Sequence, residues 1–170
     1  MSRIVVIGNA GGGKSTLARL LAAKRGFPHI EIDRLLWREG WVLTPDDTYT
    51  RQHREIIEGD GWVIDGFGQQ ISIPERIGRA TEVILIDMPL WMHFWLAAER
   101  QIAWASGRLE HTPGGITQMP STQAVFRTIW DVERSWMPTL RMLCDEAERN
   151  GKPVTRIASI DELNAYSQSV

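Results

Sequence analysis

The sequence contains only one cysteine, Cys144, among its 170 residues. A single cysteine cannot close a disulfide within the chain, so we expect no dependence on an oxidising compartment. The chain also lacks an apolar run long enough to cross a bilayer, and its first residues lead directly into a strand-like segment without the pattern of a signal peptide. These absences predict a cytoplasmic protein without a membrane segment.

An excess of positive charge is also missing. The 19 lysines and arginines and the 21 aspartates and glutamates leave a net charge of −2, and the isoelectric point is near 6.1. No overall positive field is available to hold nucleic acid or an anionic membrane surface, so we expect small-molecule partners and no direct nucleic-acid partner. A structural zinc site is not predicted either, because no histidine shows ligand spacing with Cys144: His29, His53, His93 and His111.

Length and hydrophobic pattern predict one α/β domain over residues 1–170. Short apolar runs alternate with longer amphipathic segments, which is typical of a parallel sheet flanked by helices. Helix starts are indicated at Thr44-Pro45-Asp46, with proline at the first helical position, and at the capping box Ser159 to Glu162. Five strands are predicted, at Arg3 to Gly8, His29 to Asp33, Gly61 to Asp65, Glu82 to Asp87 and Pro153 to Ile157.

The most specific motif runs from Gly8 to Ser15, where Gly-Asn-Ala-Gly-Gly-Gly-Lys-Ser matches the Walker A pattern in full. An apolar strand precedes it and a helix-like segment follows it, as the motif requires. Its glycines allow successive backbone N–H groups to surround phosphate oxygens, while Lys14 contacts the β and γ phosphates and the Ser15 hydroxyl coordinates Mg²⁺. The motif therefore predicts binding of a nucleoside triphosphate with Mg²⁺, for which ATP is the expected cofactor and GTP the open alternative, by Gly8, Asn9, Ala10, Gly11, Gly12, Gly13, Lys14, Ser15 and Thr16.

Two carboxylates at the ends of predicted strands are candidates for the same region. Asp65 follows the apolar run Trp62 to Ile64, and ligands bind at the carboxyl edge of open α/β sheets. A carboxylate there can hold Mg²⁺ together with Ser15, so Asp65 is predicted as a metal residue; the alternative is a simple turn. For Asp87, before Pro89, we favour a helix-capping role over a metal role.

Asp33 closes the second predicted strand and is expected at the same edge. An acceptor hydroxyl needs a base or an orienting carboxylate near the γ-phosphate, whereas a phosphate acceptor calls for arginines. Asp33 is therefore a candidate catalytic residue, and capping of the next helix is the equally weighted alternative.

Residues 107–120 lack a clear period and are rich in glycine and proline. Loops of this length are either functional or ordinary surface segments. A flexible loop that closes over the phosphate site and a plain surface loop both remain open.

Together these motifs resemble the adenylate-kinase-like branch of the small P-loop kinases. Asp65-Gly66-Phe67 is similar to the family's Asp-Gly-Phe segment, and Ile86-Asp87-Met88-Pro89 is similar to the junction that leads into its lid arm. Arg100 falls where the family carries a phosphate-clamping arginine, and Ser106-Gly107-Arg108 resembles the start of its lid. The resemblance spans Arg3 to about Arg141, and only its Walker A motif is highly specific.

The resemblance implies a P-loop NTPase fold with sheet order 2-3-1-4-5, an acceptor-binding region at residues 34–60 and a small lid at residues 107–120. It implies transfer of the γ-phosphoryl group of Mg-ATP to a small acceptor, which is a nucleoside, a nucleotide or a hydroxylated metabolite. The catalytic residues would be Lys14, Asp33, Arg100 and Arg108. A nucleotide-gated regulatory protein with little or no kinase activity is the alternative function.

A closer similarity is to the bacterial adenylate-kinase-related subfamily labelled topology modulation proteins. Its second strand and next segment read like His-x-x-Asp-x-Leu-x-Trp-x-x-Gly-Trp, and His29 to Trp41 resembles this string with a shift of one residue at its start. The label implies a DNA role, which the acidic composition of this chain does not support. We therefore retain the kinase interpretation.

The chain departs from the adenylate kinase pattern where an acceptor phosphate would be held. Gly68-Gln69 stands in place of Pro-Arg after the Asp-Gly-Phe segment, and Leu96 stands where the lid arm would carry an arginine. AMP specificity would then require another clamp, such as Arg76 or Arg79. Three further arginines recur every seven residues, which predicts one helix face: Arg127, Arg134 and Arg141. Each is a candidate phosphate contact, and a solvated basic face is the alternative for at least one of them.

Eight tryptophans are present, and most must pack in the core. Trp91 and Trp95 are four residues apart, which predicts a helix face turned toward the sheet or a neighbouring helix. Trp37 and Trp41 follow Asp33 in the predicted acceptor region, where one of them either stacks on a substrate or forms the pocket wall.

Overall fold

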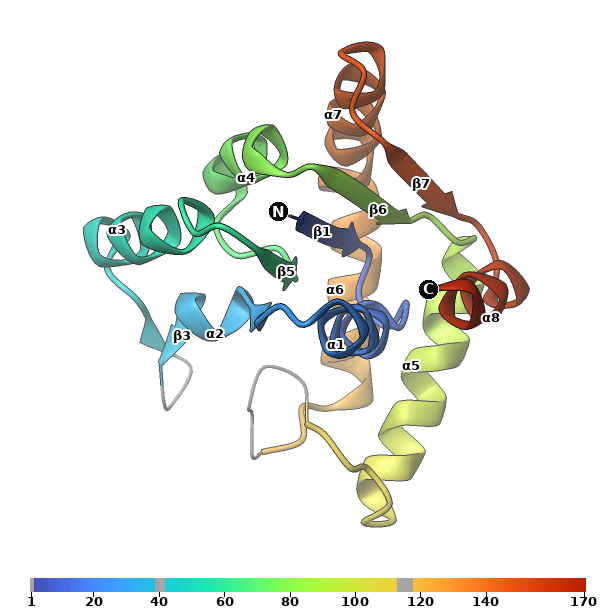
Figure 1. Cartoon of the computed structure of the whole chain (residues 1–170). Helices are drawn as coiled ribbons and strands as arrows, with labels where there is room; N and C mark the ends of the chain where they lie inside the picture. Colours follow the sequence, from blue (N-terminus) through green and yellow to red (C-terminus); the bar gives the residue numbers. More distant parts are fainter. Residues whose placement is uncertain (1, 39–41, 113–117) are drawn as a thin grey trace.

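A parallel sheet of five strands forms the centre of the molecule. The computed structural model describes residues 2–38, 42–112 and 118–170. The strands lie in the order β2-β5-β1-β6-β7, and every neighbouring pair is parallel (Figure 1). Their bounds are β1 Arg3–Gly8, β2 His29–Glu31, β5 Trp62–Asp65, β6 Glu82–Ile86 and β7 Val154–Ile157. The predicted α/β class and the helix-flanked parallel sheet are confirmed, and β1 has the predicted bounds.

The strand numbers differ from the predicted order 2-3-1-4-5 because the chain contains a hairpin that the sequence did not predict. Its antiparallel strands are β3 (Trp37–Arg38) and β4 (Val42–Leu43), which lie between β2 and β5 along the chain. Each has only two residues, and all four are exposed, so no alternation of apolar and polar residues marks them. Counted within the central sheet alone, the succession of strands is second, third, first, fourth and fifth.

Helices cover both faces of the sheet (Figure 1). On one face, α1 (Lys14–Arg25) and α8 (Ile160–Ser169) pack against apolar side chains such as Ile4, Val63 and Ile84. On the other, α3 (Asp46–Ile57), α4 (Ile73–Arg79) and α7 (Met137–Arg149) enclose a core that contains Val5, Ile64 and Leu85. Alternate residues of β1 thus point to opposite cores, as strand geometry requires.

Two long helices, α5 (Leu90–Ala105) and α6 (Thr122–Ser135), pack against each other through Ala97, Val125 and Ile129. The prediction for Trp91 and Trp95 is wrong, since their exposed fractions are 62% and 58%. The face of α5 that points inward carries His93, Ala97 and Gln101 instead. Because α5 has apolar residues all around, periodicity could not identify its buried face.

The predicted arginine face is also interrupted. Arg127 and Arg134 lie exposed on α6, whereas Arg141 lies on α7, because the helix is interrupted near Trp136 and Pro138.

The predicted helix starts agree more closely with the structure. Pro45 is the N-cap of α3 rather than its first residue, and Ser159 caps α8 by accepting a hydrogen bond from Glu162 N at 3.1 Å. No helix within the described residues is long and apolar enough to span a membrane.

Candidate functional site

The site is organised by the loop between β1 and α1. Because the strands are parallel, the carboxyl ends of β1, β2, β5 and β6 meet at one edge of the sheet. The glycine-rich loop, residues 9–13, starts there and ends at the N-terminus of α1. Backbone N–H groups at such a terminus are free to bind an anion.

Glycine is required in this loop for steric reasons. Gly11 has φ 77°, and a Cβ there would lie 2.8 Å from the carbonyl oxygen of His93. A Cβ at Gly12 would lie 2.9 Å from Cε1 of His93 and from Cγ2 of Ile86. The loop therefore packs so closely on α5 and β6 that side chains are excluded from its inner surface.

Two buried side chains fix the glycine-rich loop from the interior of the protein. Asn9 is fully buried, donates from Nδ2 to the carbonyl oxygen of Ile129 at 2.9 Å, and accepts at Oδ1 from Ala10 N at 2.7 Å. His93 is also buried and donates from Nδ1 to the carbonyl oxygen of Ala10 at 2.9 Å. Burial lowers the pKa of His93, which keeps the ring neutral. Sequence reasoning did not identify His93, since a lone histidine on an apolar helix carries no pattern.

Lys14 begins α1 and is turned back across the loop. Its Nζ donates to the carbonyl oxygen of Asn9 at 2.7 Å and lies 5.9 Å from the centre of the Phe67 ring. Burial lowers the pKa of Lys14, while the charges of Asp65 and Asp33 raise it. The charges of both candidate carboxylates therefore act on the Lys14 ammonium group.

Ser15 and Asp65 are in direct contact. Ser15 Oγ donates to Oδ2 of Asp65 at 2.5 Å, and His29 Nε2 donates to Oδ1 of the same carboxylate at 2.7 Å. Asp65 is 2% exposed and does not act as a simple turn residue. The two predicted metal residues are thus adjacent, and His29, which was not predicted in the site, orients one of them.

Asp33 lies at the start of the short helix α2 (Asp33–Leu36) and not at the end of β2 as predicted. It does not cap α2. Its Oδ1 accepts from Gly68 N at 2.8 Å and from Phe67 N at 3.2 Å. Burial raises the pKa of Asp33, while the hydrogen bond from Gly68 and the charge of Lys14 lower it.

A pocket of about 670 Å³ adjoins the glycine-rich loop. Arg100 on α5 lines it, and burial lowers the pKa of this guanidinium. In the part of the chain that the structure describes, Nε of Arg100 is buried without a hydrogen-bond partner. The other lining residues are Gly11, Gly12, Gly13, Lys14, Ser15, Thr16, Arg19, Glu31, Leu96, Leu109, Glu110, His111, Thr112, Ile160, Leu163 and Asn164.

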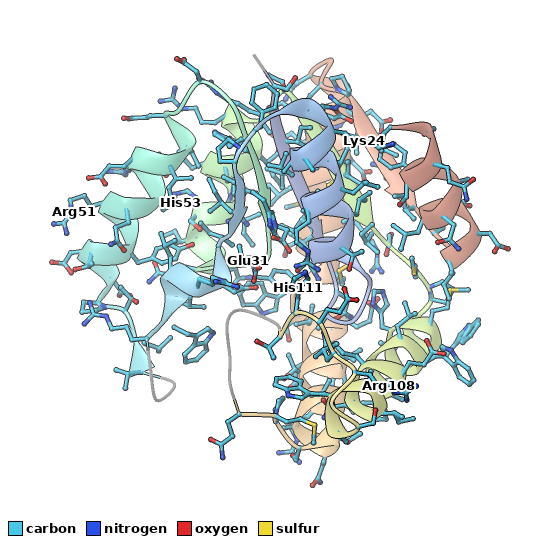
Figure 2. All side chains as sticks on the ribbon, turned by 60° about the horizontal axis from the view of Figure 1, so that its bottom comes forward. Lys24, Glu31, Arg51, His53, Arg108 and His111 are labelled. Carbon is cyan, nitrogen blue, oxygen red and sulfur yellow. The ribbon has the colours of Figure 1, made fainter. Side chains whose placement is uncertain are left out.

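Arg108 does not join Arg100 at this pocket. It is exposed just beyond α5 and donates from Nε to Ser106 Oγ at 2.9 Å, whereas His111 lies near Glu31 where both line the pocket (Figure 2). Residues 113–117 of the predicted lid lie outside the described residues. Closure of the lid and a role for Arg108 stay predictions.

The position after the Asp-Gly-Phe segment where an arginine would hold an acceptor phosphate carries Gln69. Gln69 donates from Nε2 to Oδ1 of Asp46 at 2.8 Å, so its side chain is turned toward α3. Arg76 is fully buried and Arg79 is exposed on the last turn of α4. Trp37 is 38% exposed on the hairpin, and Trp41 lies outside the described residues.

The capping role predicted for Asp87 is wrong. The N-cap of α5 is Pro89, which has no side-chain cap, and Asp87 instead accepts hydrogen bonds from Arg141 Nε and Nη2 at 3.0 and 2.7 Å. Arg141 also donates to Oε1 of Glu133 at 2.8 Å. These two carboxylates neutralise Arg141, so it is not available as a free phosphate contact in this conformation.

Few protein ligands are gathered for a metal ion. Among the described residues, no group of three or more histidine, cysteine, aspartate or glutamate side chains is placed to hold one. Ser15 and Asp65 alone would need additional oxygen ligands, which substrate phosphates and water supply for Mg²⁺. No family model matches the chain, and no curated protein matches it.

Proposed function

We propose that the protein is a phosphotransferase of the adenylate-kinase-like P-loop type, which moves the γ-phosphoryl group of Mg-ATP to a hydroxyl group of a small acceptor. This proposal rests mainly on the hydrogen bond between Ser15 and Asp65, which lies where the glycine-rich loop enters α1, beside a pocket of about 670 Å³. A regulatory nucleotide-binding protein would need the loop but not a second carboxylate, Asp33, next to it.

The residues of the pocket fit a triphosphate. The N–H groups of the loop and the N-terminus of α1 supply hydrogen-bond donors and partial positive charge. Lys14 would exchange its bond to the Asn9 carbonyl for phosphate oxygens, and Arg100, whose Nε has no hydrogen-bond partner among the described residues, would approach them from α5. These two cations would offset part of the negative charge of the phosphates during transfer.

The metal would be held by Ser15 and Asp65. Their oxygens are 2.5 Å apart, so one ion can contact Ser15 directly and Asp65 directly or through water. His29 fixes the orientation of Asp65 from the other side. Bound there, Mg²⁺ supplies charge neutralisation for the transferred group.

The acceptor chemistry is assigned to Asp33. Its Oδ1 is held by two backbone N–H groups, and Oδ2 has no hydrogen-bond donor among the described residues. Oδ2 would take the proton of the acceptor hydroxyl while the oxygen bonds to the γ-phosphorus and the bond to the β–γ bridging oxygen breaks. ADP leaves, and the proton remains on Asp33 until solvent removes it.

The test combines binding with turnover. Calorimetry would measure the dissociation constant of ATP, and ADP release would be followed with nucleosides, nucleoside monophosphates and small hydroxylated metabolites. Acceptor-dependent ADP release with phosphorylated acceptor supports the proposal. Tight ATP binding with no transfer to any acceptor would assign the protein to the regulatory class, and absence of ATP binding would reject both.

A further inference from the structure

Arg76 is a fully buried arginine on α4 that the proposed chemistry does not use. Its Nη2 donates to the carbonyl oxygens of Gly66 and Phe67 at 3.1 and 3.0 Å. In the described part of the chain, its Nε and Nη1 make no hydrogen bond of good geometry, although the Tyr49 hydroxyl lies close enough to the guanidinium to raise its pKa. Burying a guanidinium is costly unless nearby charges compensate it. A role for this side chain must therefore be sought in what it faces.

The two carbonyls that Arg76 contacts belong to the same peptide groups that bind Asp33. The first peptide joins Gly66 to Phe67, and the second joins Phe67 to Gly68. In each, the carbonyl oxygen accepts from Arg76 while the N–H donates to Oδ1 of Asp33. Because C=O and N–H point in opposite directions in a trans peptide, the segment from Gly66 to Gly68 lies between a cation and a carboxylate.

The geometry of this segment leaves little freedom. Gly66 and Gly68 have φ of 96° and 61°, which only glycine adopts readily. A Cβ at Gly68 would lie 2.0 Å from the hydroxyl oxygen of Tyr49, and that oxygen also accepts from Gln69 N at 3.0 Å. Tyr49 therefore supports the segment from α3 while Arg76 supports it from α4.

Electrostatics agrees with this arrangement. Burial lowers the pKa of Arg76, and Tyr49, Asp33 and Asp65 raise it. The guanidinium thus serves as a buried countercharge behind both carboxylates of the site, although it contacts neither by a hydrogen bond. Aligned peptide dipoles carry part of its field to Asp33.

We propose that Arg76 is a positioning residue, which aligns the peptide groups of Gly66, Phe67 and Gly68 so that Asp33 is held with Oδ2 toward the acceptor hydroxyl. This inference rests on the phosphotransferase function proposed above. Arg76 does not touch substrate in this role, and it cannot serve as the clamp for an acceptor phosphate, because its side chain is fully buried.

The first experiment compares Arg76→Met and Arg76→Lys with the control Arg149→Met, which removes an exposed arginine at the end of α7. We expect Arg76→Met to lower kcat for acceptor phosphorylation by about tenfold to a hundredfold, as loss of an orienting partner typically does. The dissociation constant of ATP should stay within about twofold, and Arg76→Lys should restore part of kcat. Arg149→Met should behave as wild type.

A double-mutant cycle separates positioning from a general loss of structure. Once Asp33→Asn has removed the carboxylate, adding Arg76→Met should lower kcat little further, because the two residues act through one chain of hydrogen bonds. Multiplicative losses, or a parallel rise in the dissociation constant of ATP, would overturn the proposal.

A readout without turnover covers the remaining cases. If Arg76→Met does not fold, NMR is used instead to compare the backbone amide chemical shifts of Arg76→Lys and Tyr49→Phe with those of wild type. The amide protons of Phe67 and Gly68 should shift in Asp33→Asn, and should shift in the same direction in Arg76→Lys. Unchanged amide shifts in Arg76→Lys would reject the positioning role. If wild type phosphorylates no acceptor but these shifts appear, the proposed function has failed and the coupling of Arg76 to Asp33 stands.

Discussion

Ser15 Oγ donates a hydrogen bond of 2.5 Å to Oδ2 of Asp65, although the two residues are 50 positions apart in the chain. The contact joins the first turn of α1 to the end of β5, and it places a hydroxyl and a carboxylate where the glycine-rich loop ends. His29 completes the arrangement from β2. The first turn of α1, β5 and β2 therefore each place one side chain at this site.

The first prediction concerns this point. Asp65→Asn should raise the Mg²⁺ concentration needed for half-maximal activity by about tenfold or more while changing nucleotide affinity little, because an amide is a weaker ligand for Mg²⁺ than a carboxylate. Magnesium titrations of turnover and calorimetry with ATP provide the two measurements. An unaltered magnesium titration would remove Asp65 from the metal site.

Lys14→Ala should weaken ATP binding and lower kcat by about a hundredfold or more, because a cation on the transferred phosphates is lost. Lys24→Ala is the matched control, since Lys24 is an exposed lysine on the same helix. Both variants should unfold within a few degrees of wild type in a thermal scan. Normal turnover by Lys14→Ala would contradict the proposed role of the loop.

Arg100→Ala should lower kcat by about a hundredfold and raise KM much less, since a clamp on developing charge acts mainly in the transition state. Arg108→Ala provides the comparison, because Arg108 was predicted beside Arg100 but does not line the pocket in this conformation. Large and similar losses of kcat in both variants would indicate that the lid closes and carries Arg108 to the phosphates. Negligible losses of kcat in both variants would remove Arg100 and Arg108 from catalysis.

The fourth prediction uses a buried histidine outside the site. Burial is the main cause that lowers the pKa of His53 to about 4, and its ring is stacked on Tyr49 with centroids 5.8 Å apart. Below pH 6.5 the unfolded chain binds a proton that folded His53 does not, so stability falls with decreasing pH until about pH 4. The loss amounts to about 3 kcal/mol for a shift of this size.

Urea unfolding at pH 7.5 and pH 4.5 tests this expectation. His53→Phe keeps an aromatic ring against Tyr49 and should lose much of the difference between the two pH values. His111→Asn, which changes an exposed histidine, should retain it. The same pH dependence in all three proteins would show that His53 is not responsible.

Local patterns in the sequence predicted the parts of the fold that are locally determined. Apolar runs identified all five strands of the sheet, and the Walker A motif identified the loop that starts the candidate site. Periodicity failed for α5, because Trp91 and Trp95 are apolar yet exposed, whereas polar His93 is buried under the loop. The hairpin was missed because its strands are short and exposed.

Contacts between distant residues carried no signal in the sequence. Asn9 bonds to Ile129, 120 residues away, and His29 bonds to Asp65 only because parallel strands bring their ends together. Arg76 looks in the sequence like an ordinary helix arginine. Its burial depends on the packing of α4 against the segment after β5, which a single sequence does not show.

The last prediction concerns the acceptor. A hydroxyl compound such as a nucleoside or a small metabolite should be phosphorylated better than AMP, because the carboxylate of Asp33 lies on the acceptor side and neither Gln69 nor Arg76 offers a cation to an acceptor phosphate there. Gln69 is turned to Asp46, and Arg76 is buried behind the peptide groups that bind Asp33. A phosphate dianion beside Asp33 would be repelled, whereas a neutral hydroxyl would not.

A side-by-side transfer assay with nucleosides, AMP and other monophosphates makes the comparison, with Asp33→Asn as the control. For the preferred hydroxyl acceptor, Asp33→Asn should lower kcat by about a hundredfold to ten-thousandfold, as loss of a general base does. ATP affinity should be retained, which separates loss of the base from loss of the donor site. Strong phosphorylation of AMP that survives Asp33→Asn would instead restore an adenylate kinase assignment. Since Arg76 is buried, the missing clamp would then have to come from Arg79 or from the lid.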